Sequence, residues 1–308
     1  MPSPTDKILS TDINTLQQDV EQTMGSGIGE YGYGQTVLSS PISIGQQIQK
    51  SHFDAIRFDI VNIYLHQFGT LQNFIEASKS IPIAAGAGDP INRYQSLINQ
   101  LRNTRFDLAT NQSSGAILID TKEYDSSVSG TWSSSAEAEI TVTFSTATEA
   151  RHFFNSGGKI RIFTELDTSS IASPTQQTNA WKNLFAGLNV DFGAGTSTLI
   201  NYYRLTNSYQ EYFAKNDSTP YSSNTYILSA KCDVPDNSTG TAKIVTIKIR
   251  LEDNYADLGA PPPGDEVQGK LQMTLSEIKA DAIAGIKPGN TPFTITSPSY
   301  TMSSISVT

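Results

Sequence analysis

The spacing of apolar residues changes near residue 106, and this change constrains the fold more than any other feature of the sequence. Before it, apolar residues recur every three or four positions, the period of an amphipathic helix. After it, apolar and polar residues alternate, the period of a strand with one solvated face. The pattern predicts an α+β fold that is mainly β, an antiparallel β-sandwich carrying short helices and preceded by N-terminal helices. Because 308 residues exceed the usual single-domain size, we expect a helical N-terminal assembly region, 1–105, and a β-sandwich domain, 106–308.

The first predicted helix has one apolar face and ends at Gly25. This face is formed by Ile13, Leu16, Val20 and Met24. A helix of about three turns is marginal unless it docks on something, so the face packs either on its own domain or on another subunit. We assign three of these residues, and two tyrosines that follow, to subunit assembly: Ile13, Leu16, Val20, Tyr31 and Tyr33.

Two further helices are predicted in the first third of the chain. The first of them starts at Ser51 with a pattern like a capping box and ends at Gly69. The other begins at Asp89-Pro90, a good N-cap and first-turn pair, and carries its apolar face to Leu101.

The segment 25–34 is rich in glycine and tyrosine, and its glycines permit backbone conformations closed to other residues. It lacks the Gly-Lys-Ser/Thr ending of a phosphate loop and no strand-like run precedes it. Nucleotide binding is therefore not expected.

A strand–helix–strand passage is expected around residues 138–162. Residues 138–144 alternate as a strand, 147–155 form a short helix, and Asn155 to Gly158 match a left-handed helix end. We expect Phe153 and Phe154 to plug the sheet. The motif residues that we single out are Phe153, Phe154, Asn155, Gly157 and Gly158.

The remaining chain reads mostly as strands. The clearest is a β-hairpin in which Tyr226–Cys232 pairs with Val245–Leu251 across the turn 236–240. Further elements are expected as a helix over 173–187, strands over 198–205, 271–275, 293–295 and 300–307, and a stiff proline connector over 261–264.

The sequence offers little catalytic chemistry. His52 and His66 lie about four turns apart on one predicted helix, so they cannot act on one substrate, and His152 is expected to be a packed or surface residue. No metal-ligand spacing or nucleophile motif occurs. The carboxylate pairs Glu137/Glu139 and Asp253/Asp257 fall on predicted wet faces or loops, and the acidic turns beside them do not match a calcium-loop spacing. We expect no catalytic residue, no metal and no cofactor, hence no enzyme.

Charge and composition point to assembly. The net charge of −9 disfavours nucleic-acid binding, which needs a basic surface. Only 17% of residues are charged, against about 25% in typical proteins, and neutral polar residues take their place. Such surfaces can be buried against a partner at lower desolvation cost than ions. The single cysteine, Cys232, fits a reducing cytoplasm, and we expect neither a secretory signal in residues 1–7 nor a membrane span.

A cluster of aromatic residues offers an alternative role. Tyr202, Tyr212 and Tyr221 lie in a segment rich in Ser, Asn and Thr, a mix used by adaptable binding surfaces. They form either an exposed platform for a glycan or part of the sandwich core. The sequence pattern leaves both readings open.

Several segments resemble virion structural proteins of myovirus-type tailed phages, notably those infecting cyanobacteria. They are residues 32–36, 53–60, 142–161, 236–240 and 260–265. The most specific is Phe-Phe-Asn-Ser-Gly-Gly at 153–158, and the resemblance covers residues 29–306. It implies a tail, baseplate, fibre-attachment or neck subunit that assembles in the host cytoplasm with copies of itself and other virion proteins. The alternatives are a host-glycan-binding module of the particle and a polysaccharide-degrading enzyme.

Overall fold

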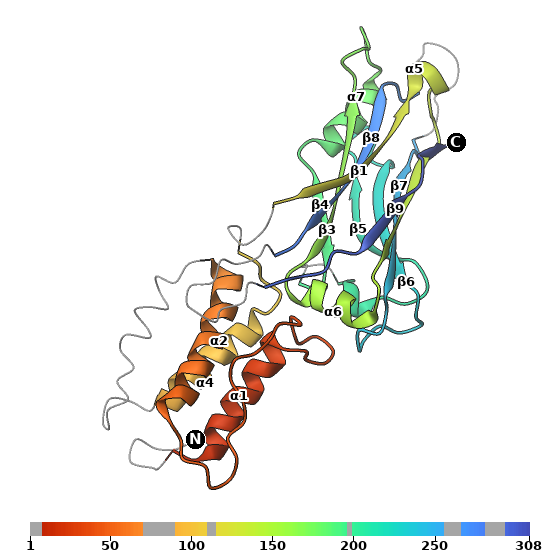
Figure 1. Ribbon diagram of the computed structural model, residues 1–308. Helices are drawn as coiled ribbons and strands as arrows, with labels where there is room; N and C mark the ends of the chain where they lie inside the picture. The colour runs from red at the N-terminus through yellow and green to blue at the C-terminus, as the bar shows by residue number, and fades with distance from the viewer. Residues whose placement is uncertain (1–7, 70–89, 110–114, 196–198, 256–265, 281–292) are drawn as a thin grey trace. The chain divides into compact units, whose positions relative to one another are not determined.

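The computed structural model describes residues 8–69, 90–109, 115–195, 199–255, 266–280 and 293–308 (Figure 1). The chain divides into two compact units. The helical unit comprises residues 1–115, 148–158 and 278–297, and the sheet unit comprises 116–147, 159–277 and 298–308. Where the sequence suggests one boundary at 105/106, the units instead divide near residue 115, and the helical unit takes in two later segments of the chain.

The helical unit is built on α1 (Ser10–Met24), α2 (Lys50–Phe68) and α4 (Pro90–Asn103). α2 starts one residue before the predicted Ser51, because the backbone N–H of Gln49 donates to His52 Nδ1 at 3.1 Å. It ends as predicted at Gly69, whose φ of 74° is left-handed. The expected N-cap Asp89 lies outside the described residues.

The apolar face of α1 is buried inside its own chain. Ile13, Leu16 and Val20 are all 0% exposed, in a core shared with α2, α4 and Phe293. The prediction that these three residues contact another subunit is therefore wrong, because helices of the same unit already cover them. The pattern gave an apolar face correctly but could not say what covers it.

The sheet unit contains two antiparallel sheets. One has the order β1-β8-β3-β4 and comprises β1 (Ile117–Asp125), β8 (Lys270–Ile278), β3 (Lys159–Asp167) and β4 (Asn189–Gly193). The other has the order β10-β2-β7-β6-β5, with β9 also on β2; its strands are β10 (Ser306–Val307), β2 (Ser135–Thr143), β7 (Ile244–Glu252), β6 (Thr225–Cys232), β5 (Gln210–Asn216) and β9 (Ser299–Met302). The short helices are α5 (Ser126–Ser129), α6 (Ala147–Asn155), α7 (Gln176–Phe185) and the 3₁₀ turn η1 (Tyr202–Arg204).

Side chains from the two sheets meet in one core. The hydroxyls of Thr164 on β3 and Tyr226 on β6 lie 3.0 Å apart, and the rings of Phe192 on β4 and Tyr212 on β5 lie 5.1 Å apart. About 29% of the chain is helix and 30% strand. The predicted α+β class, with an antiparallel sandwich and short helices, is confirmed.

The predicted hairpin is also confirmed. Tyr226 lies opposite Leu251 and Cys232 opposite Val245, so the apolar residues of β6 and β7 share a face. Strict alternation fixes this register, because a slip by one residue would turn every apolar side chain to the other face.

Two predicted strands do not form. Residues 202–204 make η1 instead, because the side chain of Asn201 accepts a hydrogen bond from Tyr203 N and starts a turn. Phe293 and Ile295 are buried but lie in no strand. The proline connector 261–264 lies outside the described residues.

Candidate functional site

Two segments that the sequence singles out lie together in the helical unit: the glycine loop, residues 25–34, and the motif at the end of α6. The loop turns back on itself through glycines with positive φ. Gly32 has φ of 93°, and a Cβ there would lie 2.5 Å from Ser26 O. A Cβ on Gly34 would lie 2.2 Å from His152 Nδ1. A side chain at either position would push the loop apart or off α6.

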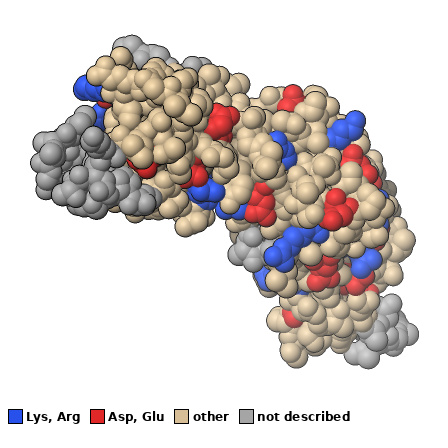
Figure 2. Space-filling model, turned by 90° about the horizontal axis from the view of Figure 1, so that it is seen from below, with Lys and Arg blue, Asp and Glu red and all other residues tan. Residues whose placement is uncertain are grey.

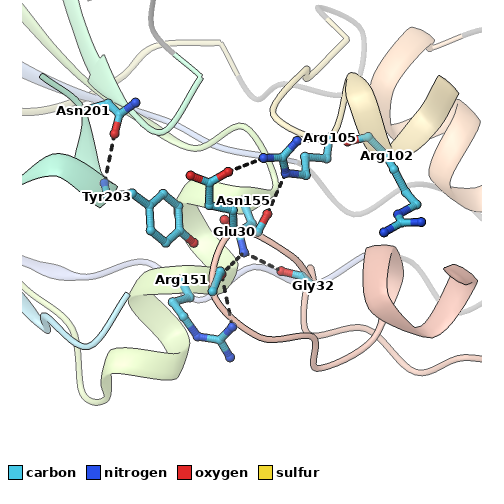
Figure 3. Close-up of polar contacts among 9 residues, drawn as sticks. Glu30, Gly32, Arg102, Arg105, Arg151, Asn155, Asn201 and Tyr203 are labelled. Carbon is cyan, nitrogen blue, oxygen red and sulfur yellow. Dashed lines mark hydrogen bonds and ion pairs between the residues drawn. The ribbon is translucent and has the colours of Figure 1, made fainter. Parts of the chain in front are cut away.

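Side chains of α6 donate to the backbone carbonyls of this loop (Figure 3). Arg151 Nη1 lies 3.3 Å from Gly29 O, and Arg151 Nη2 lies 3.3 Å from Ser26 O. Asn155 Nδ2 donates to Gly29 O and Gly32 O, each at 3.2 Å. His152 Nε2 lies 3.0 Å from Ser26 O, so this ring nitrogen carries the proton. We call this set of contacts the loop–α6 junction.

In the loop–α6 junction, backbone carbonyl oxygens surround the positively charged guanidinium of Arg151. Phosphate loops present backbone N–H groups to an anion, whereas this loop presents carbonyl oxygens. A guanidinium offers five N–H donors in a fixed plane, which suits a ring of carbonyls. The loop therefore secures a helix of its own chain, in keeping with the absence of phosphate-loop motifs.

Arg102, in the last turn of α4, and Arg105, just after α4, hold the loop by a second set of contacts (Figure 3). Arg105 Nε donates to Glu30 O at 2.8 Å, and its guanidinium pairs with the Glu30 carboxylate. Arg102 and Arg105 also lie 5.3 and 4.8 Å from the centre of the Tyr31 ring. Tyr33 is 1% exposed, and its hydroxyl donates to Arg105 O at 2.7 Å. Tyr31 and Tyr33, predicted to serve assembly, thus make contacts within the chain, and Tyr33 is buried there.

His66 on α2 connects the helices to the end of α6. Its Nε2 donates to Ser156 O at 2.8 Å, and its ring lies 4.8 Å from that of Tyr33 and 5.0 Å from that of Phe293. Burial lowers the pKa of His66 to about 4. The imidazole is therefore neutral at pH 7.

The predicted left-handed end of α6 is confirmed. Gly157 has φ of 83° and donates to Phe154 O at 3.2 Å, while Gly158 donates to Phe153 O at 2.9 Å. Asn155 is fully buried. Phe153 and Phe154 are also fully buried, in T-shaped contact 5.1 Å apart. Segment 148–158, expected to plug the sheet with these rings, belongs to the helical unit.

The tyrosines proposed as a ligand platform are buried. Tyr202, Tyr212 and Tyr221 are 0%, 6% and 7% exposed. The Tyr202 hydroxyl donates to Ala242 O at 2.7 Å, and the rings of Tyr221 and Tyr255 make a T-shaped contact. The reading of these three as an exposed platform is wrong, because all three pack into the sheet unit.

The acidic residues considered for catalysis are engaged in pairs. Glu139 accepts a hydrogen bond from the Tyr209 hydroxyl, and Glu137 lies 3.7 Å from Lys248. Asp253 accepts from the side chain of Gln177, and Asp257 lies outside the described residues.

Within the described ranges, no three His, Cys, Asp or Glu side chains gather as a metal site. No helix in the same ranges is long and apolar enough to cross a membrane.

Sequence reasoning missed the role of Arg151 in the loop–α6 junction, and it missed the separate pair of Arg105 and Glu30 that also holds the loop. The only local signal was the spacing of Arg151 and Asn155, which puts both on one helix face. Their partners lie more than a hundred residues earlier in the chain. Comparison of the chain with protein-family models, curated proteins and solved structures gave no significant match.

Proposed function

We propose that this chain is a non-enzymatic structural subunit of a tailed-phage virion, a tail, baseplate, fibre-attachment or neck component. It acts by assembling with copies of itself and with other virion proteins. The observation that carries the proposal concerns residues 150–158, which contain the most specific part of the resemblance to virion proteins, 153–158. The side chains of Arg151, His152 and Asn155 form hydrogen bonds with backbone carbonyls of the glycine loop.

A catalytic group must reach a substrate with a free donor, acceptor or lone pair. Arg151 is 9% exposed and Asn155 is 0% exposed, and both donate to carbonyls of their own chain. Removing Arg151 would take away the α6 donor to Gly27 O and Tyr31 O, and removing Asn155 would take away the α6 donor to Gly32 O, so stability accounts for both side chains. This favours a structural over a chemical role for the motif.

The surface composition supports the same proposal. Charges of both signs are interspersed among neutral residues on the face drawn in Figure 2. Neutral polar surface of this kind is compatible with close contact between subunits, because little charge has to be desolvated.

The glycan-binding alternative was suggested by three tyrosines that could have formed an exposed platform, and these tyrosines are buried. Tyr202, Tyr212 and Tyr221 would have to leave the core to stack on a sugar ring. We therefore do not carry this role forward as a second function.

The test is location in particles. Antibodies raised against the full chain should label one fixed site on tailed particles in immunogold electron microscopy, and the chain should co-purify with them through density gradients. A particle preparation blocked with free antigen is the control. Antigen confined to the soluble fraction of the lysate would refute the virion assignment.

The non-enzymatic part is tested separately. Purified chain incubated with cell-wall and capsular polysaccharides should release no reducing sugar above a heat-denatured sample. Turnover by the native chain would refute this part alone.

A further inference from the structure

One edge of the four-stranded sheet carries exposed apolar side chains. β1 is the terminal strand of that sheet, and its first residues, Ile117, Leu118 and Ile119, are 39%, 64% and 37% exposed. The pairing with β8 shifts between Leu118 and Asp120, so Ile119 is an extra residue in a bulge. An apolar edge strand is a template for pairing with another chain.

The hydrogen-bond pattern identifies the backbone groups that face this edge. Ser126 N donates to Gly269 O at 3.0 Å, directly beyond the pair Asp125–Lys270. In an antiparallel ladder, residues that bond to the neighbouring strand alternate with residues whose N–H and C=O point away. Asp125, Glu123 and Thr121 therefore direct their backbone groups away from β8.

These groups allow few registers for pairing with a second copy. A two-fold axis can pass through a hydrogen-bonded or a non-hydrogen-bonded pair, because an antiparallel ladder is symmetric about both. An axis at Asp120 or Lys122 would place that charge opposite its own copy, and an axis at Tyr124 would place Glu123 opposite Asp125, which is unfavourable. An axis at Glu123 or Asp125 would place two like charges directly opposite one another, which is unfavourable. An axis at Thr121 places threonine opposite threonine, a favourable pair.

The Thr121 register is also complementary in charge. It places Asp120 of each copy opposite Lys122 of the other. Within one chain these two side chains already pair, with Lys122 Nζ 2.9 Å from Asp120 Oδ2. A second copy would turn this pair into an alternating set of four charges.

The position of the pair gives this arrangement a physical reason. Asp120 lies opposite Leu275 and Lys122 opposite Met273 on β8, and both of those partners are fully buried. Asp120 and Lys122 therefore lie on the core-facing side of the sheet, at its edge, where each side chain is about one third exposed and its burial by a second copy without an opposite charge would be costly. Opposite charges from a second copy would lower that cost.

We propose that β1 pairs antiparallel with β1 of a second copy about a two-fold axis at Thr121, joining two four-stranded sheets into one. The proposal rests on the proposed function in that it names a copy of this chain as the partner. The bulge turns Leu118 and Ile119 outward, where the second copy can cover them.

The test measures the mass of the full chain by sedimentation velocity and equilibrium. Wild type should dimerise at tens of micromolar. Thr121→Pro removes an outward N–H while leaving the ladder to β8 intact, and should raise the dimer Kd by at least about tenfold. Unchanged far-ultraviolet circular dichroism establishes that the variant folds.

Charge variants make the test independent of proline. Asp120→Lys places like charges opposite one another and should weaken the dimer by at least about tenfold. The exchange Asp120→Lys with Lys122→Asp restores both pairs and should return Kd to within about threefold of wild type. Glu211→Lys, the same change on the edge strand β5 of the other sheet, is the matched control and should leave Kd unaltered.

A disulfide tests the register itself. Thr121→Cys should oxidise to a covalent dimer, because cross-strand Cα atoms at such a pair lie about 5.5 Å apart, within disulfide range. Wild type, whose Cys232 is buried, should not cross-link.

A wild type that stays monomeric at about 100 μM would overturn the proposal and assign Asp120 and Lys122 to protecting the edge against pairing. A dimer indifferent to Thr121→Pro and to Asp120→Lys would also overturn it. Either result leaves the virion assignment standing, since particle labelling tests that independently.

Discussion

Acid should destabilise the helical unit through His66. The imidazole is buried between Tyr33 and Phe293, and Nε2 donates to Ser156 O. Among the described residues, Nδ1 has no hydrogen-bond partner. Protonating Nδ1 would therefore place a charged, unpaired N–H in an apolar environment, which is costly.

The difference in pKa between the unfolded and folded chain sets how much stability is lost in acid. The pKa is 6.5 for a free histidine and about 4 for His66 in the folded chain. One unit of difference corresponds to about 1.4 kcal/mol, so the full effect is roughly 3 kcal/mol. About 2 kcal/mol of this is lost by pH 5.

The sign of the pH dependence follows because folding favours the neutral form of the His66 imidazole. The stabilising contribution is complete above pH 6.5, where both states are neutral. It falls as the pH drops from 6.5 to 4, because the unfolded chain binds a proton that the folded chain excludes. Burial also lowers the pKa of His152, which adds in the same direction.

The two units can be followed separately in one urea titration. Ellipticity at 222 nm reports mainly on α1, α2 and α4 in the helical unit, whereas Trp132 and Trp181 both belong to the sheet unit. Between pH 7.5 and 5, the unfolding free energy from ellipticity should fall by about 2 kcal/mol more in wild type than in His66→Phe. His52→Gln, at the start of the same helix, is the control and should keep the wild-type dependence.

Equal pH dependence in wild type and His66→Phe would refute this reasoning. So would a His66 imidazole that titrates near 6.5 in nuclear magnetic resonance spectra of the folded chain, since burial would then not favour the neutral form.

Three further predictions concern the junction and the sandwich, each checked by urea unfolding. Gly32→Ala should cost about 2 kcal/mol or more, because φ is 93° and its Cβ would meet Ser26 O at 2.5 Å. Gly29→Ala, in open space at φ of 55°, should cost less than half as much. Arg151→Met should lower the ellipticity-monitored stability by about 2–4 kcal/mol by removing the α6 donor to Gly27 O and Tyr31 O, with Arg151→Lys between it and wild type. Ile247→Ala, at a fully buried position of β7, should cost about 2–5 kcal/mol in the tryptophan-monitored transition; a loss seen only by ellipticity would contradict the assignment of Ile247 to the sheet core.

Strands with one buried face were predictable from sequence, whereas two edge strands, β1 and β5, were not. β6 and β7 lie inside a sheet and alternate strictly, so the sequence predicts that they pair as a hairpin. β1 begins with three apolar residues in a row and continues with polar ones, because an edge strand with a bulge has no single buried face. β5, also at an edge, has one buried residue, Tyr212, and gives too little periodicity.

The loop–α6 junction was visible in sequence only as two separate motifs. Glycines in the loop and the end of α6 are each explained locally by backbone conformation. Their contact depends on Arg151 reaching carbonyls of residues 26–31, and nothing in a local window records a partner so distant. The same limit explains why the apolar face of α1 was assigned to another subunit.

The division of the chain between its units has a consequence for biosynthesis. The backbone passes between them at 115/116, 147/148, 158/159, 277/278 and 297/298. Phe293, 1% exposed, fills the same core as Ile13 and Leu16. A ribosome must therefore translate as far as residue 293 before the first helices acquire this packing partner. Products that terminate before residue 293 lack that partner, so quality-control proteases can remove them.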